Sequence, residues 1–108
     1  MAGKGLFIVV ASIAPEKEEA FNRWYNEDHL PKALERLPGI ISGRRYKIME
    51  GAEGYKYMAV YEFESYEAML EATKGEAIKP LIKDYNEKFG QGGRYHIRAV
   101  ETKSLFNR

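Results

Sequence analysis

The chain has 108 residues, 44% of them hydrophobic and 31% charged, a balance typical of one folded globular domain spanning residues 1–108. Its 17 basic and 16 acidic residues leave a formal net charge of +1, so neither nucleic acids nor membrane surfaces are expected partners. The absence of cysteine excludes disulfides and thiolate chemistry, and it favours a cytoplasmic location.

The first predicted element is a strand from Leu6 to Ile13, an apolar run rich in β-branched residues. Both of its alternating faces are apolar, which indicates a strand with protein packed on each side. The run is too short to span a bilayer, and no signal-peptide cleavage pattern follows it.

The first predicted helix begins at Pro15, whose fixed φ suits a first helical turn and which precedes glutamates that the helix dipole favours. Its apolar face consists of residues at helical spacing: Phe21, Trp24, Tyr25 and, continuing the spacing, Asp28. Pro31 disfavours helical geometry at the residue before it, so we expect the helix to end or kink at about His29. A further helical turn is expected over Lys32–Leu37.

Two strands joined by a hairpin are predicted next. The first covers Ile40–Met49, and the glycine-containing segment Gly51–Gly54 is typical of a hairpin connection to the second, Tyr55–Phe63. One face of the second strand carries four aromatic residues and an alanine: Tyr55, Tyr57, Ala59, Tyr61 and Phe63. Met58 and Val60 fall on its opposite face.

The last third of the sequence predicts two helices and a strand. Ser65 is a suitable N-cap for a helix that reaches about Thr73, and Ile78–Phe89 keeps a helical period as an added helix. The alternation in Arg94–Thr102 predicts the fourth strand, and Lys103–Arg108 is expected to be a short tail.

The order β-α-β-β-α-β predicts an α+β, ferredoxin-like fold with a four-stranded antiparallel sheet whose helices lie on one face. The other face would then be bare and apolar, and a second copy of the chain is the simplest cover for it. We therefore expect a homodimer. The alternative is a monomer in which the helix at Ile78–Phe89 or the terminal segments fold over the bare face.

Residues 21–46 carry a more specific signal, since they read FNRWYNEDHLPKALERLPGIISGRRY. They contain F-x-x-W-Y-x-x-x-H-x-P, then P-G, then a strand that ends in R-Y: Phe21, Trp24, Tyr25, His29, Pro31, Pro38, Gly39, Arg45 and Tyr46. This outline resembles the EthD-like family of the dimeric α+β barrel superfamily.

The resemblance implies a homodimer whose two sheets face each other as a barrel, with a pocket in each subunit between sheet and helices. It also implies a small aromatic, polyketide-like or lactone substrate, and no cofactor. Because one fold hosts many chemistries, the reaction must be argued from individual residues.

His29 is the candidate for proton transfer. It sits where the first helix is expected to end, close to Glu27 and Asp28, and both features favour a protonated imidazole near neutral pH. In that setting it can act as a general acid or base. The alternative is a histidine that only caps the helix carbonyls.

Arg45 and Tyr46 are candidates for stabilising an oxyanion, because charge-assisted hydrogen bonds strengthen as an oxygen gains charge. Side chains alternate along a strand, so Arg45 points opposite to Arg44 and Tyr46. An interfacial salt bridge of the arginine is the equally simple alternative.

The remaining candidates are residues that would line a pocket for a flat ligand: Trp24, Tyr25, Tyr57, Tyr61 and His96. The aromatic residues among them are also ordinary core or interface residues. For His96, a solvent-facing position on the fourth strand is the alternative.

The sequence holds no metal-binding spacing of histidines, no nucleotide-binding glycine motif and no readable serine triad. Together with the family resemblance, which implies the substrate class, this favours a cofactor-independent enzyme that acts on a small aromatic, polyketide-like or lactone substrate by proton transfer, as an isomerase, cyclase, dehydratase or oxygenase. The first alternative is a non-catalytic dimeric protein that binds a small hydrophobic or aromatic molecule. The second is a purely structural dimer with a filled core.

Overall fold

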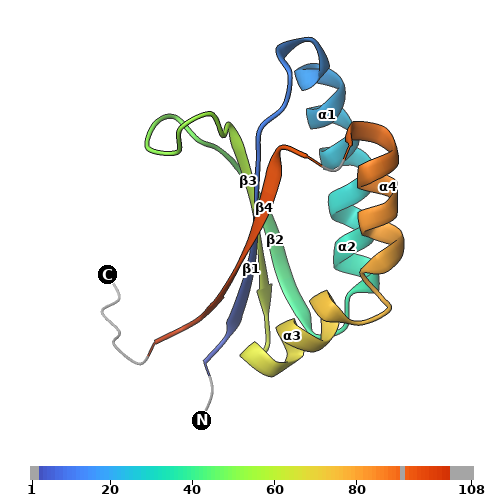
Figure 1. Ribbon diagram of the computed structural model, residues 1–108. Coiled ribbons are helices and arrows are strands. Elements are labelled where there is room, and N and C mark those ends of the chain that lie inside the picture. Colours follow the sequence, from blue (N-terminus) through green and yellow to red (C-terminus); the bar gives the residue numbers. More distant parts are fainter. Residues whose placement is uncertain (1–2, 91, 103–108) are drawn as a thin grey trace.

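The computed structural model describes residues 3–90 and 92–102 of the chain (Figure 1). One antiparallel sheet has the strand order β2-β3-β1-β4. Its strands are β1 (Gly5–Ala11), β2 (Ile40–Lys47), β3 (Tyr57–Phe63) and β4 (Arg94–Val100). The helical elements are η1 (Pro15–Lys17), α1 (Glu18–Trp24), η2 (Tyr25–His29), α2 (Leu30–Arg36), α3 (Tyr66–Lys74) and α4 (Lys79–Phe89). This is the α+β, ferredoxin-like order that the sequence predicts.

The predicted elements and the observed ones agree closely in type and position. Ser65 is the N-cap of α3, where its side-chain oxygen accepts a hydrogen bond of 3.0 Å from the backbone N–H of Ala68. The hairpin segment lies between β2 and β3, and the added helix is α4. The predicted tail at 103–108 lies outside the described residues.

The first helix differs from its prediction, because it does not end at His29. α1 passes through the π-helical turn η2 directly into α2, and the N–H of Leu30 donates to the carbonyl of Tyr25. Pro31 has no N–H, and in a regular helix its ring would clash with the carbonyl four residues earlier. The wider turn just before Pro31 provides the room, so the expected kink is a π turn and the helix continues.

The π turn also explains which side chains face the sheet. The buried residues recur every four positions: Phe21, Tyr25, His29, Ala33 and Leu37. In an α-helix four residues overshoot one turn by about 40°, so such a row would drift around the helix. A turn with one extra residue removes part of this drift. His29 thus takes an inward position, while Asp28 lies partly exposed and pairs with Lys32 at 3.1 Å.

All the helices lie on one side of the sheet (Figure 1). The side chains of β3 that they cover are Tyr57, Ala59, Tyr61 and Phe63, which pack into one core with α1, α3 and α4. α4 lies beside α2 on this covered side, so the alternative in which the helix at Ile78–Phe89 roofs the bare face is wrong.

The uncovered side of the sheet is apolar in its middle. By strand register it carries Leu6, Ile8 and Val10 of β1, Met58 and Val60 of β3, and Tyr95, Ile97 and Ala99 of β4. Tyr95 is 43% exposed and Ile97 is 40% exposed. No helix of the described chain covers these side chains.

Gly43 sets the distance between α2 and the sheet. A Cβ added there would lie 3.0 Å from Cδ1 of Leu30 and 3.2 Å from Cδ2 of Leu34. Glycine at this point of β2 therefore allows α2 to pack closely on the strand, which brings the turn η2 and its inward side chains near the sheet.

Candidate functional site

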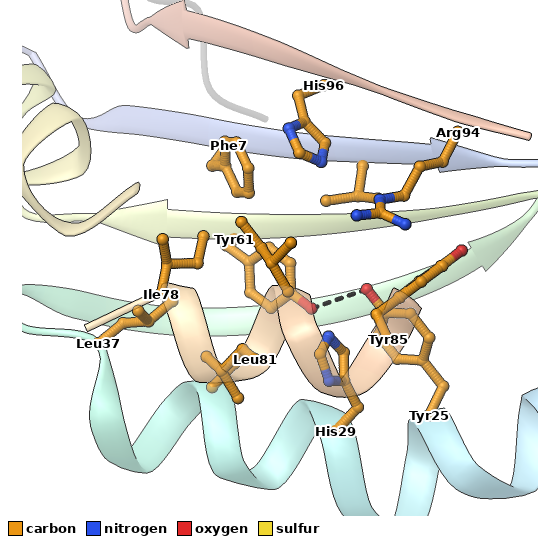
Figure 2. Close-up of a pocket in the computed structure, with 13 residues that line it drawn as sticks. Phe7, Tyr25, His29, Leu37, Tyr61, Ile78, Leu81, Tyr85, Arg94 and His96 are labelled. Carbon is orange, nitrogen blue, oxygen red and sulfur yellow. Dashed lines mark hydrogen bonds between the residues drawn. The ribbon is translucent and has the colours of Figure 1, made fainter. Parts of the chain in front are cut away.

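A cavity of about 40 Å³ lies between the sheet and the helices α2 and α4 (Figure 2). Its lining residues come from six elements of the fold or their ends: Phe7, Val9, Tyr25, His29, Ala33, Leu37, Tyr61, Ile78, Leu81, Ile82, Tyr85, Arg94 and His96. Four of the predicted site residues are among them, namely Tyr25, His29, Tyr61 and His96.

Strand register brings the sheet residues of the cavity together. Phe7 of β1 lies opposite Tyr61 of β3, and Val9 lies opposite His96 of β4. Residues opposite each other in an antiparallel pair point to the same face. The side chains of β1, β3 and β4 therefore form one wall, and α2 and α4 form the other.

His29 lies at the helix side of the cavity with 8% of its surface exposed. Its ring stacks on Trp24 at 4.5 Å, and its Nδ1 is buried with no hydrogen-bond partner among the described residues. Burial lowers the pKa of His29 to about 4, against the opposing effects of Asp84 and Asp28. The imidazole is neutral near pH 7, so the prediction that it is protonated there is wrong. A neutral imidazole can accept a proton.

Tyr25 and Tyr61 meet in the cavity through their hydroxyl oxygens, which lie 2.9 Å apart (Figure 2). Burial raises the pKa of Tyr25 to about 12 and the pKa of Tyr61 well above its usual value. Both hydroxyls therefore keep their protons. Since the bond between them uses only one proton, the pair retains one O–H that can donate to a ligand oxygen.

Arg45 lies behind the tyrosine pair and does not line this cavity. Its guanidinium stacks over the ring of Tyr25 at 4.5 Å, and its Nη1 donates to Oδ1 of Asn26 at 3.0 Å. Nε and Nη2 of Arg45 are buried without a partner among the described residues. The arginine contacts the rear face of the tyrosine pair, so it can act on the cavity only through that pair.

Tyr46 lies on the other side of the sheet. It pairs in register with Met58, whereas Arg45 pairs with Ala59, and it is 44% exposed. Alternate residues of a strand point to opposite faces, so Tyr46 cannot reach the cavity that His29 lines in its own subunit. The structure contradicts the prediction that Tyr46 and His29 act together in one cavity of one chain.

Trp24 and Tyr57 are next to the site without lining the cavity. Trp24 packs against the ring of His29, as described above, and against Phe89. Tyr57 lines a separate void of about 10 Å³ beside Arg45, and its hydroxyl bonds to Glu18 and Asn22. Both aromatic residues support the walls, as their core alternative predicts.

Two polar residues of the cavity, Tyr85 and Arg94, were not predicted from the sequence. The guanidinium of Arg94 lies 4.1 Å from the centre of the Tyr85 ring, and its Nη1 donates to the carbonyl of Gly90 at 3.3 Å. The signals were present, since Tyr85 falls on the apolar period of α4 and Arg94 precedes His96 by two residues on β4. What was missing was the placement of α4 opposite β4.

His96 lies on the edge strand β4, with its ring 4.9 Å from that of Phe7. Burial and the neighbouring charges of Arg94 and Arg98 lower the pKa of His96. His96 is solvent-exposed and also lines the cavity. The pocket-lining prediction and the solvent-facing alternative therefore each describe part of its surface.

Within residues 3–90 and 92–102, no three histidine or acidic side chains come together as a possible metal site. None of the helices in the described part of the chain combines the length and the apolar character needed to cross a bilayer.

The sequence model of one family, described as "Domain of unknown function (DUF4286)", matches residues 4–103. No curated protein is significantly similar to the chain.

Solved structures resemble the chain over nearly its whole length. An ethyl tert-butyl ether D (EthD) family protein from Bacillus halodurans has a TM-score of 0.74 at 20% identity, covering 92% of this chain and 99% of that one. A hydroxynitrile lyase from Passiflora edulis has a TM-score of 0.73 at 8% identity, with coverages of 97% and 99%. A dimeric ferredoxin-like protein of unknown function from Jannaschia has a TM-score of 0.66 at 16% identity, with coverages of 90% and 98%.

Identities this low show the fold alone. At that level the resemblance to EthD-like proteins, inferred from residues 21–46, is confirmed.

Proposed function

The chain belongs to the DUF4286 family, and we propose that it is a cofactor-independent enzyme that transfers a proton on a small aromatic, polyketide-like or lactone substrate. The observation that carries the proposal is the neutral imidazole of His29, whose Nδ1 has no partner among the described residues at the wall of an apolar cavity. An unprotonated imidazole at the cavity wall is in the form that can accept a proton from carbon or oxygen.

The other polar groups of the cavity suit the second half of such a step. As His29 takes the proton, negative charge develops on a substrate oxygen. The spare O–H of the Tyr25 and Tyr61 pair can donate to that oxygen, and the guanidinium of Arg94 lies on the same cavity wall. Arg45, stacked on Tyr25, is a positioning residue in this scheme.

The size of the cavity limits how a substrate enters. A protein cavity that holds benzene has a volume of about 150 Å³, and this one has about 40 Å³. A ring therefore enters only when a wall moves. α4 supplies three of the lining residues and its N-cap Ile78 is a fourth, so displacement of this helix enlarges the cavity most directly.

A non-catalytic binding protein is the second candidate. The observation that favours it is the composition of the walls, because most of the lining residues are aliphatic or aromatic. The hydroxynitrile lyase of the same fold is by name an enzyme, and it supports the catalytic candidate by analogy of fold only.

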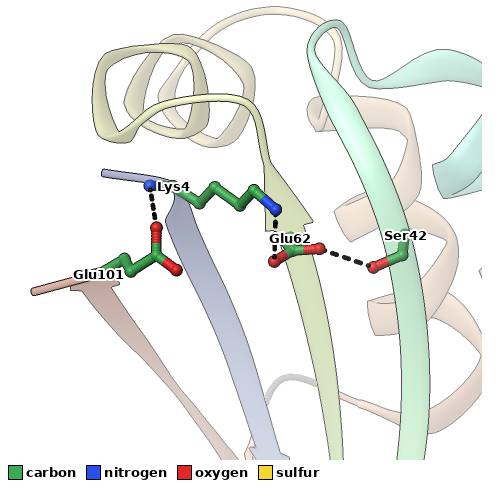
Figure 3. A network of polar contacts seen from close by, with 4 residues as sticks. All are labelled: Lys4, Ser42, Glu62 and Glu101. Atoms are coloured by element: carbon green, nitrogen blue, oxygen red, sulfur yellow. Dashed lines mark hydrogen bonds and ion pairs between the residues drawn. The ribbon is translucent and has the colours of Figure 1, made fainter. Parts of the chain in front are cut away.

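The proposal includes a homodimer formed through the uncovered side of the sheet. Its middle is apolar, and polar contacts border one end of it, where Lys4 pairs with Glu62 at 3.8 Å and Ser42 donates to Glu62 at 3.4 Å (Figure 3). An apolar centre with a polar rim is the usual composition of a protein interface. The solved Jannaschia protein of the same fold is dimeric by its description.

The test is proton exchange. Small phenols and lactones are first screened by thermal shift, and each compound that binds is then incubated with the protein in D₂O while its C–H signals are followed by NMR. We expect the protein to accelerate loss of a C–H signal and His29→Ala to slow it by about 10²-fold or more. Added imidazole should partly restore the rate in that variant.

Arg23→Gln, a change at an exposed position on α1, serves as the control and should leave the rate unchanged. Exchange that persists in His29→Ala would contradict the role of His29. Binding without exchange for every compound would favour the second candidate.

A further inference from the structure

Three arginines lie on the covered side of the sheet. By register, Arg45 lies opposite Ala59, Arg94 opposite Ala11 and Arg98 opposite Phe7. Each guanidinium stacks on an aromatic ring, with Arg98 at 5.1 Å from Phe7 and the other two as described above. The face that forms the cavity wall therefore carries a row of positive charges among apolar residues.

None of these arginines has an acidic partner in the described part of the chain. Every ion pair there is made by a lysine: Lys4, Lys32, Lys56, Lys79, Lys83 and Lys88. The arginines donate to neutral oxygens instead, which are Oδ1 of Asn26, the carbonyl of Gly90, and both Oγ1 and the carbonyl of Thr73.

Among the residues that line the cavity, one is an arginine without an acidic partner. Arg94 is the one lining residue with a full charge, since no aspartate or glutamate lines the cavity and burial disfavours the charged form of both lining histidines. The nearby Asp84 is paired with Lys88 at 3.2 Å. A guanidinium offers five N–H donors. Arg94 directs one to the carbonyl of Gly90 and also interacts with the hydroxyl of Tyr85, and its other donors are available to a ligand.

The polar and apolar parts of the cavity are also separated along its length. In Figure 2, Leu37, Ile78 and Leu81 gather toward one end, and Arg94 and Tyr85 lie toward the other. This arrangement fits a molecule with an apolar body and one polar end. A carboxylate matches the guanidinium best, because the two groups can form parallel charge-assisted hydrogen bonds.

We propose that the ligand of the cavity is a small apolar carboxylic acid, bound as its anion, whose carboxylate pairs with Arg94 while its ring or chain lies against Leu37, Ile78 and Leu81. The inference rests on the proposed function, because it names the substrate class of the same cavity. His96 lies two residues after Arg94 on β4, and its neutral imidazole can donate a second hydrogen bond to the carboxylate. His29 lines the same cavity.

The test compares an acid with its neutral amide of nearly equal shape. Phenylacetate and phenylacetamide are titrated into the full-length protein, and binding is followed by calorimetry and by chemical shift changes in NMR. We expect phenylacetate to bind at least about tenfold more tightly than the amide, because a charge-assisted pair replaces a neutral contact. Arg94→Gln should remove most of that preference and leave the weak binding of the amide unchanged.

Arg23→Gln makes the same chemical change at an exposed site of α1 and should retain the preference. Circular dichroism of both variants shows whether the fold is kept. Should Arg94→Gln fail to fold, Arg94→Lys provides the second test, with a preference smaller than that of the wild type because lysine cannot form the parallel pair of bonds.

The possible results distinguish failure of the carboxylate proposal from failure of the proposed function. Equal binding of acid and amide would overturn the inference and leave a ligand cavity in place. The same preference in wild type and Arg94→Gln would also overturn it. If neither compound bound at millimolar concentration, both the inference and the proposed ligand cavity would fail.

Discussion

At the scale of single residues, burial controls the chemistry of the cavity. His29 is surrounded by the rings of Trp24, Tyr25 and Tyr85, and two nearby carboxylates are too weak to offset the loss of water. The same burial keeps the two tyrosine hydroxyls protonated. One base and one donor are thus available in their useful forms at neutral pH.

The lowered pKa of His29 predicts a pH dependence of stability. Its pKa of about 4 in the folded protein lies below the ordinary value of 6.5, so between these values the unfolded chain binds more protons. The free energy of unfolding therefore increases as pH rises through this window and decreases as pH falls. We expect His29 to lower stability by about 2 kcal/mol at pH 5 relative to pH 7.5.

Urea unfolding of wild type and His29→Gln at the two pH values measures this effect. The difference between pH 5 and pH 7.5 should be smaller in the variant. His96→Gln is the comparison, since the pKa of His96 is lowered as well and acts in the same direction. An unchanged pH dependence in His29→Gln would show that the imidazole is not buried in its neutral form.

The sequence identified part of the residues of this cavity. Tyr25 and Tyr61 were found because helix spacing and strand alternation place them on inner faces, whereas His29 was found from its position at the expected helix end and from the resemblance of residues 21–46. Tyr46 was proposed to act together with His29, although strand alternation places it on the other face of the sheet from Arg45. Arg94 and Tyr85 were missed because their contact depends on how α4 packs against β4, which no local pattern contains.

At the scale of elements, the sequence predicts helix ends well where a cap residue bonds only to its neighbours in the chain. Ser65 begins α3 as predicted because its hydrogen bond to Ala68 involves only its own neighbours in the chain. The π turn η2 was not predicted. This turn accommodates the ring of Pro31, which is a local constraint, and it also keeps Tyr25 and His29 facing the sheet. The second constraint comes from tertiary packing.

The cap of α3 gives a prediction at this scale. Ser65→Ala should lower the free energy of unfolding by about 1 kcal/mol, because the N–H of Ala68 loses its acceptor. Ser65→Asp should retain most of the stability, since a carboxylate accepts the same bond and favours the helix N-terminus. Urea denaturation of the three proteins gives the comparison, and equal midpoints for all three would contradict the capping role.

At the scale of the whole molecule, the order of elements decided the fold, and the one-sided placement of the helices follows from it. The sequence did not show which face stays bare. The structure places the aromatic residues of β3 under the helices and leaves Ile8 and Val60 on the other side.

The bare face predicts the effect of a charge on assembly. Val60 lies beside Ile8 near the middle of that face, so Val60→Glu would place an unpaired carboxylate inside the proposed interface. We expect wild type to be dimeric and Val60→Glu monomeric in light scattering coupled to size exclusion. Lys83→Glu on the exposed side of α4 is the control and should remain dimeric. A dimer of unchanged stability in Val60→Glu would exclude this face as the contact.

The small volume of the cavity also has a kinetic consequence. If a ring enters only when the cavity is in a sparsely populated open conformation, the rate of opening limits the rate at which complexes form. Observed association rates would then level off as the ligand is made more concentrated. Measured affinity would include the penalty of populating the open state, so variants that favour opening would bind more tightly without gaining a single new contact.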